Sequence, residues 1–408
     1  MKNLTTAIGA GAIHADHEHR YNDYIASGQT QILGDVDHRK LTAEQNPLPI
    51  MGSEQVFKIA PRGNMWLSDV ILVSSVSSVN KTGGSYARLC NAFPIHMVDQ
   101  IRLLHHGRQF WSKDNFNHTY QKVLQHNDDE WLYVHKKRLG IMNSNERNSA
   151  SSDVQTFSLN FNEFCSFFSV PVPLFVAGGD IEIRIKYKTM DEVIETDGSN
   201  PSFSFLKSYL DVKYIDPGHN DLMKREVERA ASRGQFRIVD YSPLNMRFNV
   251  PVGSSRGVFN LTSLQNKHVI YMNITSRDVS KVNSGDYTSY NKVLRYNLDS
   301  AGRRISGAEY DITDSDFRHI LIDDYGFKGV KTLIDENIYT ISYASNLSNA
   351  LGNDHHELVD CKSFRGINDA RLTIEYSEGV ADSQQVDIDC SILKTIFIHP
   401  GRIVSIDG

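Results

Sequence analysis

The sequence predicts an all-β protein made of two β-sandwiches of similar size, arranged in tandem and joined by a helix. Three observations support this prediction. Short β-branched and apolar segments follow one another from residue 54 onward, separated by turn residues. A charged helical pattern interrupts them once, near residue 225. The segments before and after this pattern, 51–215 and 235–408, are nearly equal in length, and each is of the size of one domain.

The composition is that of an ordinary globular protein. The chain has 408 residues, of which 40% are hydrophobic and 23% are charged, and its formal net charge is −6. A negative chain without a long run of Lys or Arg is no nucleic-acid condenser, so we expect no direct sequence-specific binding of nucleic acid. No stretch reaches 18 apolar residues, so no transmembrane helix is expected.

The cysteines and the first 50 residues are both unremarkable in pattern. The four cysteines lie far apart in sequence and show no zinc-ligand spacing, which favours reduced thiols. Residues 1–50 are polar and show no sustained period of 3.6 or 2. We therefore expect residues 1–50 to form an N-terminal arm that is ordered only by a neighbouring molecule.

The first β unit is predicted to span 51–215. In Asp180–Lys186 the isoleucines alternate with charged residues, which is typical of a half-buried antiparallel strand. A helix is expected over 112–126, with Ser112 as its N-cap. The predicted strands are Val56–Ile59, Met65–Val73, Val98–Leu104, Thr156–Phe161, Phe167–Val172, Asp180–Lys186 and Leu206–Ile215.

A helical linker is predicted over 216–234. Asp221–Arg233 has the strongest helical pattern of the chain, and Gly234 follows it as a C-terminal stop signal. This segment carries charges of both signs and few large apolar residues. It is therefore expected to connect two β domains rather than to fill a core.

The second β unit is predicted to span 235–408, with a helix over 313–325 capped by Thr313. Each unit then has roughly eight strands and one inserted helix, and eight antiparallel strands in two sheets make a jelly roll. The fold class predicted is all-β, with two tandem eight-stranded antiparallel jelly-roll β-sandwiches, short inserted helices and a helical interdomain linker. The predicted strands are Phe236–Tyr241, Met246–Val250, Val258–Leu261, His268–Ile274, Lys292–Tyr296, Asn337–Tyr343, Ala370–Tyr376, Val386–Cys390 and Leu393–Ile398.

Several of these segments, taken in order, resemble the double jelly-roll major capsid proteins of icosahedral double-stranded DNA viruses. Leu210–Ile215 and the charged helix after it look like the last strand of the first jelly roll and the interdomain helix of that family. Asn346–Asp360 stands where the family usually has another short motif, which leaves a giant-virus, phage, virophage-like or small eukaryotic virus member open. The other similar segments are Val98–Gln109, Val172–Val176, Asn260–Ile270, Ile338–Tyr343 and Ser363–Leu372.

The resemblance implies a major capsid protein that forms a homotrimer, a pseudo-hexagonal capsomer that tiles an icosahedral virion shell. It further implies contacts with neighbouring capsomers, with the penton and with minor capsid or cement proteins. An internal membrane could be reached through the N-terminal arm. The expected location is the virion, after assembly in the host cytoplasm or nucleus. Two sandwiches per chain also explain the geometry, because three copies present six similar corners to a hexagonal lattice.

A search for chemistry leads us to predict no catalytic, cofactor-binding or metal-binding residue and no enzymatic activity. His14, His17 and His19 could bind a metal, but on one short segment they are too close together to surround an ion. Asp354–Glu357 is a second such cluster. Asp311–Asp316 lacks the glycine and the glutamate of a calcium loop, and Gly326–Thr332 has the wrong spacing for a phosphate-binding loop.

Two other classes of function stay open at this point. One is a receptor- or carbohydrate-binding β-sandwich virion protein, such as a spike or minor capsid protein, which would display an exposed aromatic platform. The other is a tandem β-sandwich enzyme, which would need a cleft with convergent titratable groups. Five phenylalanines between residues 157 and 168 fit either a core or a subunit contact.

Overall fold

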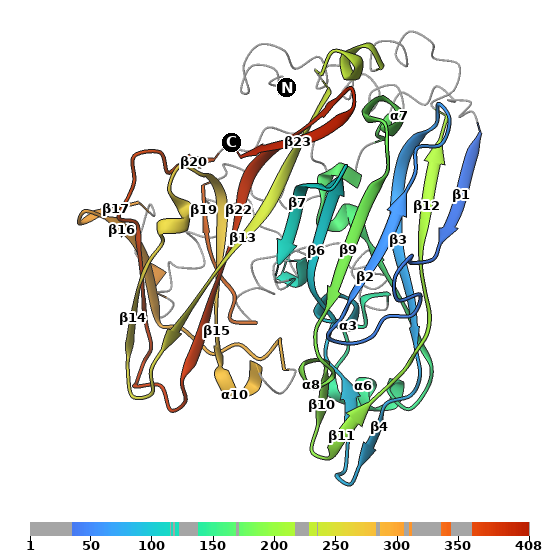
Figure 1. Ribbon diagram of the computed structural model, residues 1–408. Helices are drawn as coiled ribbons and strands as arrows, with labels where there is room; N and C mark the ends of the chain where they lie inside the picture. The colour runs from blue at the N-terminus through green and yellow to red at the C-terminus, as the bar shows by residue number, and fades with distance from the viewer. Residues whose placement is uncertain are drawn as a thin grey trace, which may run out of the picture.

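Two antiparallel sandwiches lie side by side in the computed structural model, the first at the right and the second at the left of Figure 1. The first is formed by the N-terminal half of the chain and the second by the C-terminal half. The residues described are 35–114, 116, 119–121, 138–168, 171–216, 228–234, 236–282, 286–305, 310–311, 336–343 and 361–407.

The first sandwich consists of two four-stranded sheets. One sheet has the order β1 (Val36–Leu41), β12 (Phe205–Ile215), β3 (Trp66–Val76) and β8 (Gln155–Asn160). The other has the order β2 (Glu54–Ile59), β9 (Ile181–Tyr187), β6 (Val98–His105) and β7 (Arg108–Asp114). Numbered along the chain, these eight strands give sheets 1-8-3-6 and 2-7-4-5, which is the strand order of a jelly roll.

The second sandwich repeats this strand order. One sheet is β13 (Phe236–Val250), β22 (Gln384–His399), β15 (His268–Asp278) and β19 (Tyr339–Ser342). The other is β14 (Arg256–Asn260), β21 (Arg371–Glu375) and β16 (Arg295–Ser300), which pairs with both β17 (Arg303–Arg304) and β18 (Tyr310–Asp311). The chain therefore contains two jelly rolls of the same topology, and the predicted fold class is confirmed.

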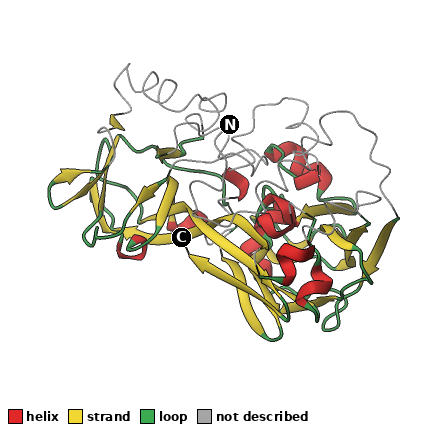
Figure 2. Cartoon of the chain, turned by 90° about the horizontal axis from the view of Figure 1, so that it is seen from above, coloured by secondary structure: helices red, strands yellow, loops and turns green. Residues whose placement is uncertain are grey.

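Short elements decorate the connections. Figure 2 shows most of the helices gathered on the first jelly roll. The ribbons β5–β10 and β4–β11 extend its lower end, while β20 and β23 add to the second jelly roll. These elements are β4 (Asn80–Thr82), β5 (Ala87–Leu89), α3 (Phe93–His96), α6 (Ser144–Ala150), η1 (Phe161–Glu163), η2 (Ser166–Phe168), α7 (Leu174–Ala177), α8 (Met190–Val193), β10 (Ile194–Thr196), β11 (Ser199–Ser202), η3 (Thr262–Leu264), α10 (Val279–Val282), β20 (Lys362–Ser363) and β23 (Arg402–Asp407).

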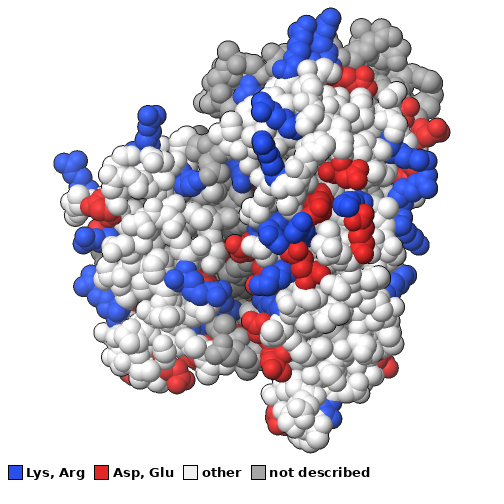
Figure 3. Space-filling model, viewed as in Figure 1, with Lys and Arg blue, Asp and Glu red and all other residues white. Residues whose placement is uncertain are grey.

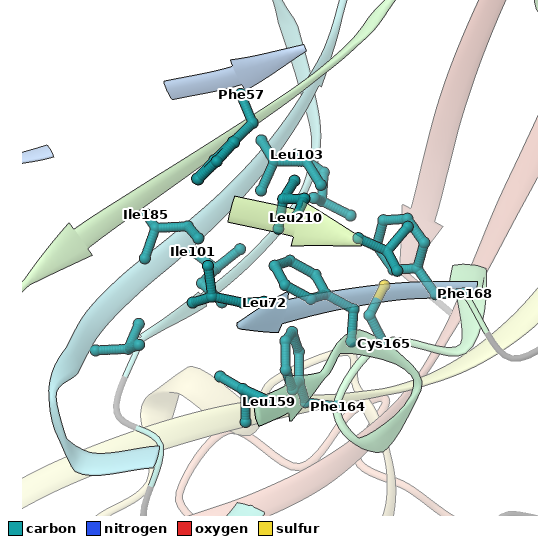
Figure 4. Close-up of a cluster of buried hydrophobic side chains, with 14 of the residues drawn as sticks. Phe57, Leu72, Ile101, Leu103, Leu159, Phe164, Cys165, Phe168, Ile185 and Leu210 are labelled. Carbon is teal, nitrogen blue, oxygen red and sulfur yellow. The ribbon is translucent and has the colours of Figure 1, made fainter. Parts of the chain in front are cut away.

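The core of the first jelly roll is filled by the apolar residues that alternate with polar ones along its strands. Ile181, Ile183 and Ile185 of β9 are all buried, while the charged residues between them point away, as the alternating sequence predicts. Figure 4 shows Ile185 in one cluster with Phe57 and Ile101 from the two neighbouring strands and with Leu72 from the opposite sheet. All five phenylalanines between residues 157 and 168 are buried in this same cluster, so they belong to the core of the first jelly roll.

Two of the predicted elements in the first half are wrong. Phe167–Val172 is no strand: residues 166–168 form the 3-10 turn η2, because a strand would send Phe167 and Phe168 to opposite faces and both are buried in one core. Ser112 is no N-cap, because it lies inside β7 and pairs with Arg102 of β6. Of the helix predicted over 112–126, residues 119–121 are helical and 122–126 lie outside the described residues.

Three further predictions differ from the structure in extent. Phe236–Tyr241 and Met246–Val250 are parts of one strand, β13, and Val386–Cys390 and Leu393–Ile398 are parts of β22. Pro243 is tolerated within β13 because β13 is the outer strand of its sheet and pairs only with β22. Residues 36–41, inside the segment predicted as an arm, form β1 and pair with β12.

Two predicted helices fall largely outside the described residues. Of the predicted linker helix, residues 228–232 are helical and 221–227 lie outside the described part. The helix predicted over 313–325 lies wholly outside it.

Candidate functional site at the interface between the jelly rolls

The β13-β22-β15-β19 sheet is buried on both of its faces. Along β22, alternate residues from Val386 to Ile392 belong to the apolar core of the second jelly roll. The residues between them point the other way, toward the first jelly roll, and they are polar yet also buried. This second set consists of Gln385, Asp387, Asp389 and Ser391 on β22, with Asn273, Thr275 and Arg277 opposite them on β15.

Asp387 is the most strongly paired residue of this polar face. Its carboxylate accepts hydrogen bonds from Arg277 Nη2 at 2.5 Å and from Arg247 Nε at 2.9 Å. Burial alone would raise the pKa of Asp387, but the charges of Arg277 and Arg247 outweigh it and lower the pKa below its usual value. Asp387 is therefore a buried anion held between two guanidinium groups, which is how a buried charge is tolerated.

Asp389 lies two residues further along β22, and its carboxylate accepts hydrogen bonds from two side-chain amides. Asn245 Nδ2 donates to Asp389 Oδ1 at 2.7 Å, and Gln121 Nε2 donates to Asp389 Oδ2 at 3.1 Å. Burial, together with the negative charge of Asp387, raises the pKa of Asp389 to about 7. Gln121 belongs to the first jelly roll, and its Oε1 accepts from Asn273 Nδ2 at 3.0 Å, so one side chain bridges two strands of the second.

Near the other end of the interface the contact is mainly apolar. Ile238 of β13 and Ile396 of β22 are paired across the ladder and belong to the apolar cluster of the first jelly roll. Asp240, between them and the polar rows, accepts hydrogen bonds from Trp111 Nε1 at 2.8 Å and from the Ser166 amide at 2.9 Å. The long ribbon of β13 and β22 therefore continues beyond its own sandwich and lies against the first, as Figure 1 shows.

An aromatic group borders the polar rows. Tyr287 stacks on His96 of the first jelly roll with ring centroids 4.7 Å apart. Lys188 Nζ lies 3.8 Å from the centroid of the Tyr287 ring, and burial lowers the pKa of Lys188 to about 8. Beyond the contact the two jelly rolls diverge, and Figure 3 shows a notch at the lower end with charged side chains of both signs on its walls.

The predicted absence of a chemical site can be compared only in part with the structure. The clusters at 14–19 and 354–357 and the segment 326–332 lie outside the described residues, and of Asp311–Asp316 only Asp311 is described. Within the described part, no three His, Cys, Asp or Glu side chains gather as a metal site would require. His106 lies in the exposed turn between β6 and β7, whereas His105, the last residue of β6, is buried with its Nε2 at the Gly178 carbonyl oxygen.

The pockets found in the described part are either very small or open to solvent. The pocket beside Cys90, Phe93 and Phe157 has a free volume near 10 Å³, about the space of one water molecule. A second pocket, lined by residues of α8, β10 and β11, has a volume of about 750 Å³ but is an open depression. The most exposed large apolar side chains in the described ranges are all Val, Leu or Ile. None of the helices described is both long and apolar enough to cross a bilayer.

No protein-family model and no curated protein sequence matches this chain. Solved structures do match it. The PBCV-1 protein VP54, fitted into a reconstruction of the virophage Sputnik, is 12% identical with a TM-score of 0.65, over 93% of this chain and 98% of that one. The Faustovirus major capsid protein is 8% identical with a TM-score of 0.64, over 98% and 100%. A Sputnik virophage chain is 9% identical with a TM-score of 0.53, over 92% and 89%.

The comparisons and the strand order agree on one fold. The match extends over nearly the whole of each chain, so it includes both sandwiches and their relative placement. At identities this low, likeness establishes the fold and leaves function to be argued. The chain has the double jelly-roll fold that is also found in viral major capsid proteins.

Proposed function

We propose, from the double jelly-roll fold established above, that this chain is a major capsid protein that forms homotrimeric, pseudo-hexagonal capsomers of an icosahedral shell. The observation that carries the proposal is the buried interface between the jelly rolls. Its buried carboxylates, Asp240, Asp387 and Asp389, all have hydrogen-bond donors, and Asp240 and Asp389 each accept from a side chain of the first jelly roll. Such an interface holds two sandwiches as one rigid block, which a shell tile requires.

The geometry of a shell explains why two sandwiches per chain are useful. Three copies of one chain contain six jelly rolls of the same topology, which present six similar corners to a lattice with hexagonal packing. The work of such a protein is mechanical, and no catalytic, cofactor or metal residue is proposed.

The finer partners are proposals that rest on the same reading. Neighbouring capsomers, the penton and minor capsid or cement proteins would contact the outer rim of the trimer. The N-terminal segment before β1 would serve as a tether to a neighbour or to an internal membrane. In this organisation residues 51–215 together with β1 form the first jelly roll, 216–234 is the linker and 235–408 is the second jelly roll. The particle would assemble in the host cytoplasm or nucleus.

The solution mass of the purified protein tests the proposal. One chain has a mass of 46.1 kDa, so light scattering coupled to size exclusion should give three times that value. Electron microscopy should then show particles with hexagonal outlines. A monomer that persists at micromolar concentration contradicts the proposed function, because an isolated chain cannot form the six-cornered tile.

A further inference from the structure

Asp389 is the carboxylate of the polar face that has the least compensation of its charge. Asp387 accepts hydrogen bonds from the guanidinium groups of Arg277 and Arg247. Asp389 accepts instead from two uncharged side-chain amides. The two carboxylates are two residues apart on one side of β22, which places their Cα atoms about 7 Å apart. Ionisation of Asp389 is therefore disfavoured by burial and by the negative charge of Asp387.

Several charged and titratable groups surround Asp389, and most of them are on the second jelly roll. These are Asp387 on β22, Arg247 on β13, Arg277 and Tyr271 on β15, and Tyr290 in the loop after α10. Both guanidinium groups are bonded to Asp387, and burial raises the pKa of both tyrosines, so their hydroxyls stay neutral. Across the contact, Lys113 of β7 donates to Thr119, two residues before Gln121. Among the described residues, no cation is hydrogen-bonded to Asp389.

A chain of hydrogen bonds connects the second jelly roll to Asp389 through one side chain of the first. Thr340 Oγ1 donates to Asn273 Oδ1 at 2.8 Å, and Asn273 Nδ2 donates to Gln121 Oε1 at 3.0 Å. Gln121 Nε2 then donates to Asp389 Oδ2 at 3.1 Å. Every donor in this chain is directed toward the carboxylate, and Gln121 is the link that belongs to the first jelly roll. The contact between the jelly rolls is therefore bonded directly to the group that ionises.

Asp389 is separated from water by the first jelly roll and not by the core of the second. It lies on the opposite side of β22 from Ile388 and Cys390, which belong to that core. The second face of an antiparallel sheet is in water unless another domain covers it. If the jelly rolls part here, Asp389 becomes hydrated while the core beneath it stays packed, and its pKa returns toward the ordinary value. Its ionisation is therefore linked to the contact between the jelly rolls.

We propose that protonation of Asp389 controls the joint between the two jelly rolls: neutral Asp389 keeps the polar face covered, and its ionisation lets the jelly rolls part there. Since the pKa of Asp389 is raised to about 7 in the closed arrangement, closure is favoured at lower pH and opening becomes easier as the pH rises through 7. The apolar end of the interface, around Ile238 and Ile396, should stay in contact. The inference goes beyond the proposed function, because all of these residues belong to one chain.

The test measures how readily a thiol reagent reaches the polar face. Thr275 is buried on this face opposite Asp387, and its Oγ1 has no hydrogen-bond partner among the described residues, so Thr275→Cys removes no bond. The background is Cys361→Ser, because Cys361 is the one exposed cysteine of the four. Val252→Cys, at a position that is 63% exposed in the turn after β13, gives the reference rate at each pH and so corrects for ionisation of the thiol itself.

The rate of maleimide labelling of Thr275→Cys, divided by that of Val252→Cys, should rise about tenfold between pH 6 and pH 8 and little more above. With Asp389→Asn added, the ratio should stay constant, because an amide has one donor and one acceptor, as the neutral acid has, and cannot ionise. Cys390 is the internal control, since its side chain lies in the second core and is labelled only when that core opens. Mass spectrometry of the peptides identifies the labelled thiol. Should Thr275→Cys fail to fold, Ser391→Cys supplies a second buried position on the same face.

A rise that Asp389→Asn abolishes, with Cys390 unlabelled, supports the inference. A constant ratio between pH 6 and pH 8 in the protein that retains Asp389 overturns it. A rise that persists in Asp389→Asn also overturns it, because another group is then responsible, and equal labelling of Cys390 assigns the change to unfolding of the second jelly roll instead. The measurement does not depend on association of chains. A monomeric protein therefore contradicts the proposed function and leaves this inference standing.

Discussion

At the scale of single residues, the interface between the jelly rolls depends on buried carboxylates that are satisfied from the opposite domain. Asp240 receives its bonds from Trp111 and Ser166, and Asp389 receives one of its two from Gln121. A buried polar group without a partner is costly, so these pairs are satisfied only in one relative placement of the two domains. The polar side chains therefore specify how the two jelly rolls are placed relative to each other, while burial of apolar side chains stabilises the contact between them.

The Trp111–Asp240 hydrogen bond predicts a difference between two tryptophan substitutions. Trp111→Phe removes one of the two donors to a buried carboxylate, and we expect it to lower the free energy of unfolding by about 1–3 kcal/mol beyond the change in volume. Trp66→Phe is the matched control, because Trp66 Nε1 has no hydrogen-bond partner among the described residues. Urea unfolding followed by circular dichroism measures both variants, and equal losses would contradict the role given to the bond.

Asp389 predicts a pH dependence with a definite sign. Its pKa in the folded chain, about 7, is above the ordinary value of 3.8, so between these values the folded state binds the extra proton. Stability should therefore fall as the pH rises from about 4 through 7, because ionisation of Asp389 is disfavoured in the folded state. Asp389→Asn removes this ionisation and should remove this part of the fall.

The comparison of Asp389→Asn with the unchanged protein isolates this effect. Between pH 5 and 7 the free energy of unfolding of the variant should gain about 2 kcal/mol relative to the unchanged protein, and little more above pH 8. Asp299→Asn, on β16 and away from the interface, serves as the matched substitution. A difference between Asp389→Asn and the unchanged protein that stays constant from pH 5 to 9 would sink the prediction.

At the scale of elements, β22 is the strand that links the two cores. On one side of this strand, Ile388 belongs to the core of the second jelly roll and Ile396, eight residues later, to that of the first. β13 pairs with β22 along its whole length without a register shift, and it too has residues in both cores. Long strands twist, so one side of the ribbon can meet different partners along its length.

Because β22 contributes to both cores, we expect a substitution that destabilises one core to destabilise the other as well. Trp66 and Trp111 are buried in the core of the first jelly roll, and the third tryptophan, Trp131, also precedes the second jelly roll in sequence. Tryptophan fluorescence is therefore used as the probe of the first jelly roll. Ile388→Ala creates a cavity in the second core and should destabilise the protein by about 2–4 kcal/mol. We expect the fluorescence transition of Ile388→Ala to shift by as much as its circular dichroism transition.

Ile396→Ala provides the comparison for that experiment. Ile396 has the same side-chain type and lies on the same strand, but it packs in the first core. Its fluorescence and circular dichroism transitions should also shift together. An unchanged fluorescence transition in Ile388→Ala, with a shift in Ile396→Ala, would mean that the jelly rolls unfold independently.

At the scale of the whole molecule, the chain is a head-to-tail pair of equivalent domains with one equivalent face covered and the other uncovered by the described elements. If three copies associate as the proposed function requires, folding and assembly are linked by mass action. The unfolding midpoint should then rise with protein concentration, which differential scanning calorimetry at concentrations spanning a hundredfold can measure. A midpoint that is independent of concentration would contradict the linkage.

By itself, the sequence determined the class of fold, because alternation of apolar and polar residues is a local property that each strand carries. The alternation of Ile181, Ile183 and Ile185 with charged residues indicates the buried face of that strand from the local sequence alone. The helical pattern near 225 likewise indicates where the β pattern is interrupted. The same local reasoning failed at Phe167 and Phe168, where two adjacent aromatic residues share one core.

Only the tertiary structure decided how the two jelly rolls meet. Gln121 and Asp389 are 268 residues apart, and no pattern in either neighbourhood indicates that they are bonded. Asp387 and Asp389 occupy the positions at which an alternating strand places its solvent-facing residues, yet they are buried because a second domain covers that face. Burial on the second face of a sheet depends on a partner distant in sequence, so local periodicity carries no trace of it.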